Sequence, residues 1–437
     1  MQRAAAALLF LALPALCSAA GSDDASSKKS RKKTSSSVKA EKRRLAAAPA
    51  AAAVATATAA AGSRQAHRDG EAEARLIEIY KLAGQAKSRE ALSKAERLVN
   101  DHPNFQLAQL VYGDLLAAQA RPLRTLGDVS DGLPKTSASM LGDLRQESLL
   151  RLKALRERPA PGTIPSQFIE LSPRNKHAIA VDASRARLYL FENTANGLKL
   201  LGDYYISVGK AGIEKSVEGD SRTPLGVYFV TSNLDPKSLK DFYGSGALPI
   251  NYPNALDLKR GKTGSGIWLH GTPPAQFARA PLASDGCVVL ANPDLERIIR
   301  TVEVRTTPVV IAQSLKWVAP HSAKADGKAF EDALHAWQKA RSGGDLTALT
   351  SLYASDFNSY GKSLTDWTTQ LRTELDKRAG RPVQLKDLSY LRWTDANDTM
   401  VVTFGEVLNG SRTGQTRRQY WVRQGSQWKI FFEGVIG

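Results

Sequence analysis

A histidine and a cysteine, each next to a glycine, are the residues of this chain whose types and surroundings could do covalent chemistry. His270-Gly271 ends an apolar run, and Ser284–Cys287 is a short polar loop before a second apolar run that begins at Val288. Nucleophilic acyl transfer requires a thiolate, a base that generates it and donors for the oxyanion. The two motifs could supply all three, and together they predict cysteine-dependent acyl transfer.

The cysteine count supports a functional thiol. The chain has two cysteines, and Cys17 lies in an N-terminal segment that is typical of an export signal, so the mature chain would retain Cys287 alone. An unpaired thiol in an oxidising compartment is expected to be either buried or used. Gly286 has no side chain, so backbone amides beside Cys287 could converge on a substrate carbonyl. The local sequence therefore favours a nucleophile over the alternative, a buried inert cysteine.

Three segments around these residues resemble the L,D-transpeptidase (YkuD-type) catalytic domain. They are Thr223–Tyr228, Ile267–Gly271 and Ser284–Val288, and a later apolar segment, Thr306–Ile311, fits the same pattern. The resemblance covers residues 165–315. It implies cysteine acyl transfer on the peptide stems of peptidoglycan, with no cofactor and no metal.

The resemblance also assigns roles by match to the family motif. Cys287 would be the nucleophile and His270 its general base, oriented by the carbonyl of Gly271. The oxyanion hole would be formed by the amides of Asp285, Gly286 and Cys287. The residues predicted to serve substrate binding are Ser284, which mainly shapes the loop, Arg222 and Trp268. Because an imidazolium would stand beside the thiol, we expect the pKa of Cys287 to lie below its ordinary value of about 8.5.

One position departs from the family pattern. Val289 stands two residues after the cysteine, where the motif commonly has an arginine that orders the substrate. The cations that could substitute for it are Lys210, Lys215, Arg222 and Arg279.

Three functions stay open. The thioester could be transferred to an amine acceptor by an L,D-transpeptidase, or hydrolysed by an L,D-carboxypeptidase that trims tetrapeptides to tripeptides. The third alternative is a non-catalytic scaffold that binds the cell wall, against which the intact His270 and Cys287 argue. The missing arginine weakens the case for transfer, and the motif does not identify the acceptor. We favour transfer because it is the commonest outcome in the family.

The elements that must position these residues are mostly strands. Apolar segments bounded by Gly, Pro and Asn turns predict strands at 178–182, 188–191, 200–208, 226–230, 267–270 and 309–312. Helical periodicity in this region is confined to 292–302. Many short strands with one helix predict a mainly-β catalytic domain, and we expect a compact β-sandwich rather than a doubly wound sheet.

The C-terminal part predicts a separate domain at 325–437. Three amphipathic helices begin near Phe330, Leu346 and Leu364, and strands follow at 383–391, 399–406, 415–424 and 427–433. This order resembles the α+β cone of nuclear-transport-factor-2-like (SnoaL-type) domains, which have a pocket but no fixed chemistry. Its Trp393, Trp421 and Trp428 could stack on sugar, but packing in the core or at the rim is favoured.

The N-terminal part predicts export followed by a tether. The chain has 437 residues and a net charge of +17. Residues 1–19 are predicted to be a cleavable signal peptide, with a retained anchor as the alternative, which places the protein in the periplasm or cell envelope. Residues 20–70 are basic and alanine-rich, which predicts disorder. Membrane contact is expected only through this tether, and nucleic acid is not an expected partner because the basic runs lack aromatic residues.

Residues 71–158 predict a helical module. Apolar residues recur at helical spacing in 76–82, 91–99, 107–117 and 140–156, and the first helices resemble a tetratricopeptide-type hairpin. Such a module would pack or dock other envelope proteins. The chain is therefore predicted to be multidomain: an α-helical hairpin module, a mainly-β YkuD-type domain and an α+β SnoaL-type cone.

Overall fold

The computed structural model describes residues 69–129, 134–378 and 380–436. The predicted signal peptide and nearly all of the predicted tether lie outside these residues. The described chain forms two compact units, one containing residues 69–101 and 110–128 and the other containing residues 102–109, 129, 134–378 and 380–436. The predicted module of 71–158 is thus divided between them. Within the described residues, every helix is too short or too polar to cross a membrane.

The first unit is helical, as the apolar spacing predicted. Helices α3 (Glu71–Gly84) and α4 (Ser88–Asp101) pair as a hairpin, and their fully buried residues are Leu76, Ile79, Ala91 and Leu98. Helix α5 (Gln106–Ala117) begins in the second unit and continues in the first. The helical hairpin at the start of the predicted module is confirmed.

The catalytic region is built on one mixed sheet of nine strands. The sheet runs in the order β6-β11-β3-β4-β5-β10-β8-β7, with β9 beside β5. In chain order the strands are β3 (His177–Asp182), β4 (Arg187–Thr194), β5 (Gly197–Gly209), β6 (Gly226–Phe229), β7 (Ala247–Pro249), β8 (Trp268–His270), β9 (Leu282–Ser284), β10 (Val288–Leu290) and β11 (Pro308–Ala312).

The mainly-β prediction is confirmed, but the β-sandwich is wrong. The central strands are buried on both faces, because one face of the single sheet shares a core with its own strands β7, β8 and β10 and with one helix, and the other face packs on the C-terminal domain. Helical structure also extends beyond the predicted segment. Besides α8 (Asn292–Thr301), the region contains α7 (Ala255–Lys259), which begins at an Asn254 capping box, and short 3-10 turns at Ala183–Arg185, Pro236–Ser238 and Asp241–Tyr243.

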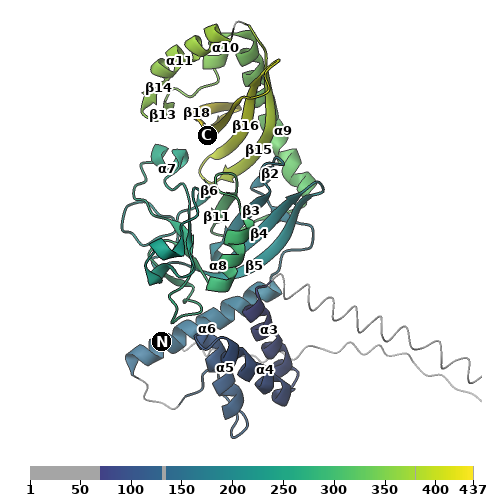
Figure 1. Ribbon diagram of the computed structural model, residues 1–437, viewed down its shortest axis with the longest axis vertical. Helices are drawn as coiled ribbons and strands as arrows, with labels where there is room; N and C mark the ends of the chain where they lie inside the picture. Colours follow the sequence, from purple (N-terminus) through teal and green to yellow (C-terminus); the bar gives the residue numbers. More distant parts are fainter. Residues whose placement is uncertain (1–68, 130–133, 379, 437) are drawn as a thin grey trace, which may run out of the picture. The chain divides into compact units, whose positions relative to one another are not determined.

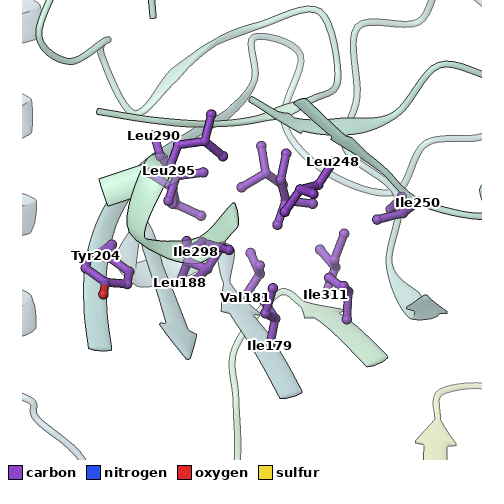
Figure 2. Packing of buried hydrophobic residues seen from close by; sticks show 14 of the residues in the cluster. Ile179, Val181, Leu188, Tyr204, Leu248, Ile250, Leu290, Leu295, Ile298 and Ile311 are labelled. Carbon is purple, nitrogen blue, oxygen red and sulfur yellow. The ribbon is translucent and has the colours of Figure 1, made fainter. Parts of the chain in front are cut away.

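Helix α8 closes the core on one face of the sheet. Leu295 and Ile298 are fully buried on this helix. Figure 2 shows Ile298 next to Leu188 of β4, and both helix residues belong to one hydrophobic cluster with Ile179 of β3 and Ile311 of β11. This packing fixes the sheet that carries the two motifs.

The C-terminal domain is the predicted α+β cone (Figure 1). Its helices are α9 (Pro320–Gly343), α10 (Leu346–Thr350) and α11 (Leu364–Lys377), and a short hairpin joins β13 (Asn358–Ser359) to β14 (Lys362–Ser363). The main strands are β15 (Val383–Thr394), β16 (Asp398–Leu408), β17 (Gln415–Gln424) and β18 (Gln427–Val435). Trp393, Trp421 and Trp428 are 6%, 0% and 8% exposed, so they pack in the core as favoured.

The two domains of the second unit share structure. Strand β2 (Phe168–Glu170), which precedes the catalytic sheet, pairs with β15 as the fifth strand of the C-terminal sheet. A second short pairing joins β1 (Ile164–Pro165) to β12 (Trp317–Val318). One hydrophobic cluster mixes residues of both domains, and a two-pronged ion pair joins Arg260 to Asp395 at 2.6 and 2.7 Å. The domains are therefore mechanically coupled.

Helix α6 (Lys135–Arg156) packs against the catalytic sheet. The buried Arg151 guanidinium lies 3.9 Å from the centre of the Tyr205 ring on β5 and 5.5 Å from that of Phe105, and it pairs with Glu147 at 2.8 Å. A buried guanidinium stacked between rings and paired with a carboxylate has its charge compensated. Helix α6 is thus fixed beside the catalytic domain.

Truncating a side chain of the shared cluster should destabilise both domains together. Phe191 is fully buried, and its ring lies 5.9 Å from that of Phe168 on the strand shared with the C-terminal sheet. Phe191→Ala should lower the free energy of unfolding by about 3–5 kcal/mol. Denaturant titration followed by tryptophan fluorescence would report mainly the C-terminal domain, because most tryptophans lie there.

The control is Val217→Ala at a site that is 54% exposed, which should change stability by less than about 0.5 kcal/mol. An unchanged fluorescence transition in Phe191→Ala would contradict the coupling of the two domains.

Candidate active site

The two motifs meet because their strands are parallel neighbours. Register pairs Val288 of β10 with Leu269 of β8, and Val289 with His270. Leu269 and Val288 face the core, so His270 and Cys287, which directly precedes β10, face the opposite side. His270 is buried and Cys287 is half-buried. The structure therefore brings the predicted base and the predicted nucleophile to one face of the sheet.

The loop before Cys287 depends on Gly286. This residue has a φ of +121°, and a Cβ there would lie 2.7 Å from the carbonyl oxygen of Arg222. The Ser284 hydroxyl donates to the Cys287 carbonyl at 2.6 Å and accepts from the Gly286 amide at 3.1 Å. Ser284 thus shapes the loop. Because the Gly286 amide donates to Ser284, the amides of Asp285 and Cys287 remain as candidate oxyanion donors of the predicted three.

Thr223 is hydrogen-bonded to the same loop. It is fully buried; its hydroxyl donates to the Gly286 carbonyl at 2.9 Å and accepts from the Gly209 amide at 2.9 Å. The cysteine loop is thereby tied to the end of β5. The motif segment that begins at Thr223 was noted in the sequence, but this positioning role was not predicted.

The imidazole is oriented by its neighbouring glycine. Nδ1 of His270 lies 2.7 Å from the carbonyl oxygen of Gly271. A carbonyl oxygen can only accept a hydrogen bond, so the neutral ring carries its proton on Nδ1 and leaves Nε2 able to accept one. This is the tautomer that a general base requires.

Asn292 fixes the turn that carries this carbonyl, and sequence reasoning missed it. Its side-chain oxygen accepts from the amides of Ser245 and Thr272, and its amide nitrogen donates to the Thr272 carbonyl. A Cβ at Gly271 would collide with the same side-chain oxygen. The signal was an Asn-Pro pair at the start of α8, which on its own predicts only a helix start.

The thiol of Cys287 is held by backbone groups. Sγ accepts from the Trp268 amide at 3.4 Å and donates to the Gly266 carbonyl at 3.4 Å. Among the described contacts, none is a hydrogen bond between this sulfur and His270. Catalytic hydrogen bonds are often completed only when substrate binds.

Burial keeps both groups neutral. It lowers the pKa of His270 to about 4, with the hydrogen bond to Gly271 opposing this shift and the charge of Arg279 adding to it. Burial also raises the pKa of the Cys287 thiol, against the Trp268 amide and Arg279, which favour the thiolate. The expectation of a lowered thiol pKa is therefore wrong, because desolvation outweighs the neighbouring charges and the imidazole is not protonated at neutral pH.

Val289 occupies the position of the missing arginine. It is 2% exposed and pairs with His270 on the same face, so it places an apolar side chain beside the imidazole. An arginine at this position would place a charge beside the buried imidazole ring, which is unfavourable unless the charge is paired.

The predicted replacement cations differ in position. Lys210 pairs with Asp285 at 2.6 Å, and Lys215 is buried against Asp220 at 2.8 Å. Arg222 is exposed and donates to the Ile213 carbonyl. Arg279 is half-buried, and its charge acts on both His270 and Cys287.

An aromatic wall lies beside the pair. The Tyr243 ring is 5.1 Å from the His270 ring and 4.8 Å from the ring of the half-buried Trp268, a predicted substrate residue. The centre of the exposed Phe242 ring lies 5.8 Å from that of the His270 ring. The Arg279 guanidinium lies over the Phe242 ring, 4.4 Å from its centre. Phe242 and Tyr243 were not predicted, because they lie on a 3-10 turn distant in sequence from both motifs.

A cavity of about 1220 Å³ lies between the two domains of the second unit. It is lined by neither His270 nor Cys287. In the part of the chain that the structure describes, no group of three or more His, Cys, Asp or Glu side chains is arranged to hold a metal ion.

Two parts of the chain match known protein families. Residues 176–311 match the model of the YkuD L,D-transpeptidase catalytic domain. This region is similar to YkuD-type L,D-transpeptidase domains. Residues 329–434 match the Cds6 C-terminal NTF2-like domain. Both predicted family resemblances are confirmed, whereas the roles of individual residues stay predictions.

Solved structures of two bacterial proteins are similar to part of this chain. Bd1075 of Bdellovibrio bacteriovorus is 23% identical, with a TM-score of 0.53 over 62% of this chain and 98% of its own. The helical cell shape determining protein Pgp2 of Campylobacter jejuni is 19% identical, with a TM-score of 0.49 over 66% of this chain and 99% of its own. No curated protein matches the sequence. At 23% identity, the similarity to Bd1075 is a similarity of fold.

Alkylation should reveal the raised thiol pKa. Because burial disfavours the thiolate, the rate of Cys287 modification by iodoacetamide should rise with pH through a midpoint above about 8.5, the ordinary value. The rate is measured by mass spectrometry of the folded protein, with the urea-unfolded chain as the matched control. A midpoint below 8.5 would restore the expectation of an imidazolium–thiolate pair.

Proposed function

We propose that the chain is a cysteine acyl transferase that acts on the tetrapeptide stems of peptidoglycan through a thioester on Cys287. The observation that carries the proposal is the β8–β10 register, which sets Cys287 and His270 on one face with Nε2 of the imidazole able to accept a proton. The YkuD family match of residues 176–311 supports the same chemistry.

In the proposed acylation step, the thiol proton passes to Nε2 of His270 while Sγ attacks the carbonyl carbon of the third stem residue. The amides of Asp285 and Cys287 stabilise the oxyanion. The intermediate collapses by breaking the bond to the terminal D-alanine, whose nitrogen takes the proton from His270. The products are free D-alanine and a thioester.

The neutral state of His270 and Cys287 before substrate binds is consistent with this order of proton transfers. Nε2 is unprotonated at neutral pH because burial depresses the imidazole pKa. The thiol is deprotonated only as the carbonyl is attacked, so Cys287 stays protected from unspecific reactions in an oxidising compartment. We propose export to the periplasm or cell envelope on the basis of the N-terminal sequence, and docking of other envelope proteins by the helical hairpin.

Transfer to an amine is the proposed second step, and hydrolysis is the second candidate. Either an amine acceptor or water attacks the thioester, and His270 accepts its proton and returns it to the leaving thiolate. Hydrolysis is favoured by one observation: the position beside His270 where the family has an arginine holds the buried Val289. A substrate-ordering charge is therefore absent at that point of the described site.

Product analysis should separate the two outcomes. With disaccharide tetrapeptide as donor, a transferase should form cross-linked or amine-adduct product at the expense of tripeptide as the amine acceptor rises to millimolar concentration. The product ratio is measured by liquid chromatography and mass spectrometry. Tripeptide alone at every acceptor concentration would assign the carboxypeptidase function, and the Cys287→Ala control should form neither product.

The pH dependence of turnover should follow the depressed imidazole pKa. A base with a pKa of about 4 stays competent as pH falls from 7, so kcat/KM should fall with acid only near pH 4. His270→Ala should lower kcat by about 10²–10⁴-fold. A wild-type acid limb near 6.5, the ordinary histidine value, would contradict the buried neutral base.

A further inference from the structure

The cavity of about 1220 Å³ between the two domains of the second unit is built from elements of both. The catalytic domain contributes Phe229 at the end of β6 and Lys259 of α7. The C-terminal domain contributes Arg418 of β17 and Tyr360, which lies in the turn between β13 and β14. Sites for small ligands usually have volumes of about 300–1,000 Å³, so the cavity is large enough to hold one.

The cavity lies outside the cone of the C-terminal domain. Successive side chains of a strand point to opposite faces of its sheet. Arg418 lines the cavity, whereas the preceding residue, Arg417, lies on the other face and pairs with Glu433 at 2.8 Å. The cavity therefore uses the face of the sheet that is turned toward the catalytic domain.

Arg418 is a buried cation that forms no ion pair with any described residue. It is 8% exposed; its Nε donates to the Thr403 hydroxyl at 3.0 Å, and its guanidinium carbon lies 3.2 Å from the centre of the Phe229 ring. Burial lowers the pKa of Arg418 to about 10, and the groups that oppose this shift are the hydroxyls of Tyr420 and Tyr360 rather than a carboxylate. The guanidinium is therefore charged at neutral pH, and a buried charge without a partner is unfavourable.

Two of the other cations that line the cavity are compensated by aspartates. Arg174 pairs with Asp387 at 2.7 Å, and Lys259 pairs with Asp356. Arg305 is the remaining cation of the lining. The lining therefore carries an excess of positive charge, which attracts an anion.

Aromatic rings and strained backbone lie around this cation. Tyr360 is 76% exposed, its ring lies 5.2 Å from that of Phe432, and the Phe432 ring lies 5.7 Å from that of Tyr420. Tyr360 has a φ of +52°, and two other lining residues, Arg305 and Asp387, have φ of +71° and +54°. A positive φ is uncommon for residues other than glycine, and such strain gathers at sites that hold ligands. The cavity thus combines an uncompensated cation with an exposed aromatic ring.

We propose that this cavity binds a small molecule that consists of a carboxylate on an aromatic ring. The terminal nitrogens of Arg418 bind the carboxylate as a planar fork, since Nε is already engaged by Thr403 and the guanidinium is stacked on Phe229. The ring packs on Tyr360 and Phe432.

A carboxylate fits better than a phosphate dianion. Arg418 supplies one uncompensated charge, and the carboxylates of Asp356 and Asp387 in the same lining would repel a second negative charge. Because neither Cys287 nor His270 lines the cavity, the proposed site is independent of the proposed function.

Titration of the intact protein with benzoate and with its uncharged isostere benzamide, followed by ligand-observed NMR, tests the site. Benzoate should bind about 10-fold or more tightly, because only the carboxylate pairs with the guanidinium. Acetate, which lacks the ring, and inorganic phosphate, which lacks the ring and carries a second charge, should each bind more weakly than benzoate.

Two variants separate the contributions of charge and ring. Arg418→Met keeps an apolar side chain of similar length, so it should abolish the preference for benzoate over benzamide without lowering the midpoint of thermal unfolding. Tyr360→Gly accepts the positive φ without strain and should weaken both probes alike. Arg423→Met is the matched control: it lies at an exposed site of the same strand outside the cavity and should leave the preference unchanged.

Equal affinity for benzoate and benzamide would overturn the inference, as would a preference for benzoate that survives in Arg418→Met. A lower unfolding midpoint in Arg418→Met would also contradict it, because the arginine would then stabilise the fold instead of serving a ligand. Tighter binding of phosphate than of benzoate would exclude the aromatic carboxylate. D-alanine release by Cys287 is measured separately, so failure of this site and failure of the proposed function are distinguishable.

Discussion

The parallel pairing of β8 with β10 is the constraint on which the site depends. A shift of the pairing by one residue would turn either His270 or Cys287 from their shared face toward the opposite face, which packs in the hydrophobic core. The remaining contacts hold this register at its ends: Thr223 and Ser284 fix the loop before β10, and Asn292 fixes the turn after β8. The core beneath, closed by α8, supplies the rigidity that two short strands lack.

Burial determines the protonation states of the two residues that this register brings together. The buried His270, with Val289 beside it on the sheet, stays uncharged at neutral pH, and the thiol keeps its proton. A neutral pair suits a base that acts only when a carbonyl is present, whereas a preformed ion pair would suit a constantly reactive thiol. The charge of Arg279 favours the thiolate and therefore opposes the effect of burial on the pKa of Cys287.

Much of this could be predicted from sequence because its signals are local. The motifs around His270 and Cys287 identified the chemistry, and apolar alternation located most strands and helices. Which strands pair is a tertiary property, so the single sheet was mistaken for a sandwich. The neutral state of the pair depends on burial, and Phe242, Asn292 and α6 come together from distant segments. None of these has a local pattern that predicts it.

The central claim, a thioester on Cys287 generated by His270, is tested most directly by trapping it. The protein is mixed with a peptidoglycan tetrapeptide, quenched in acid within one turnover and analysed by intact mass and peptide mapping. The account predicts a mass gain on the enzyme equal to the mass of the tetrapeptide minus that of D-alanine, mapped to Cys287 and removed by hydroxylamine. It predicts no gain in Cys287→Ala and a strongly slowed gain in His270→Ala. D-alanine release with no adduct on Cys287, or with equal speed in Cys287→Ala, would contradict it.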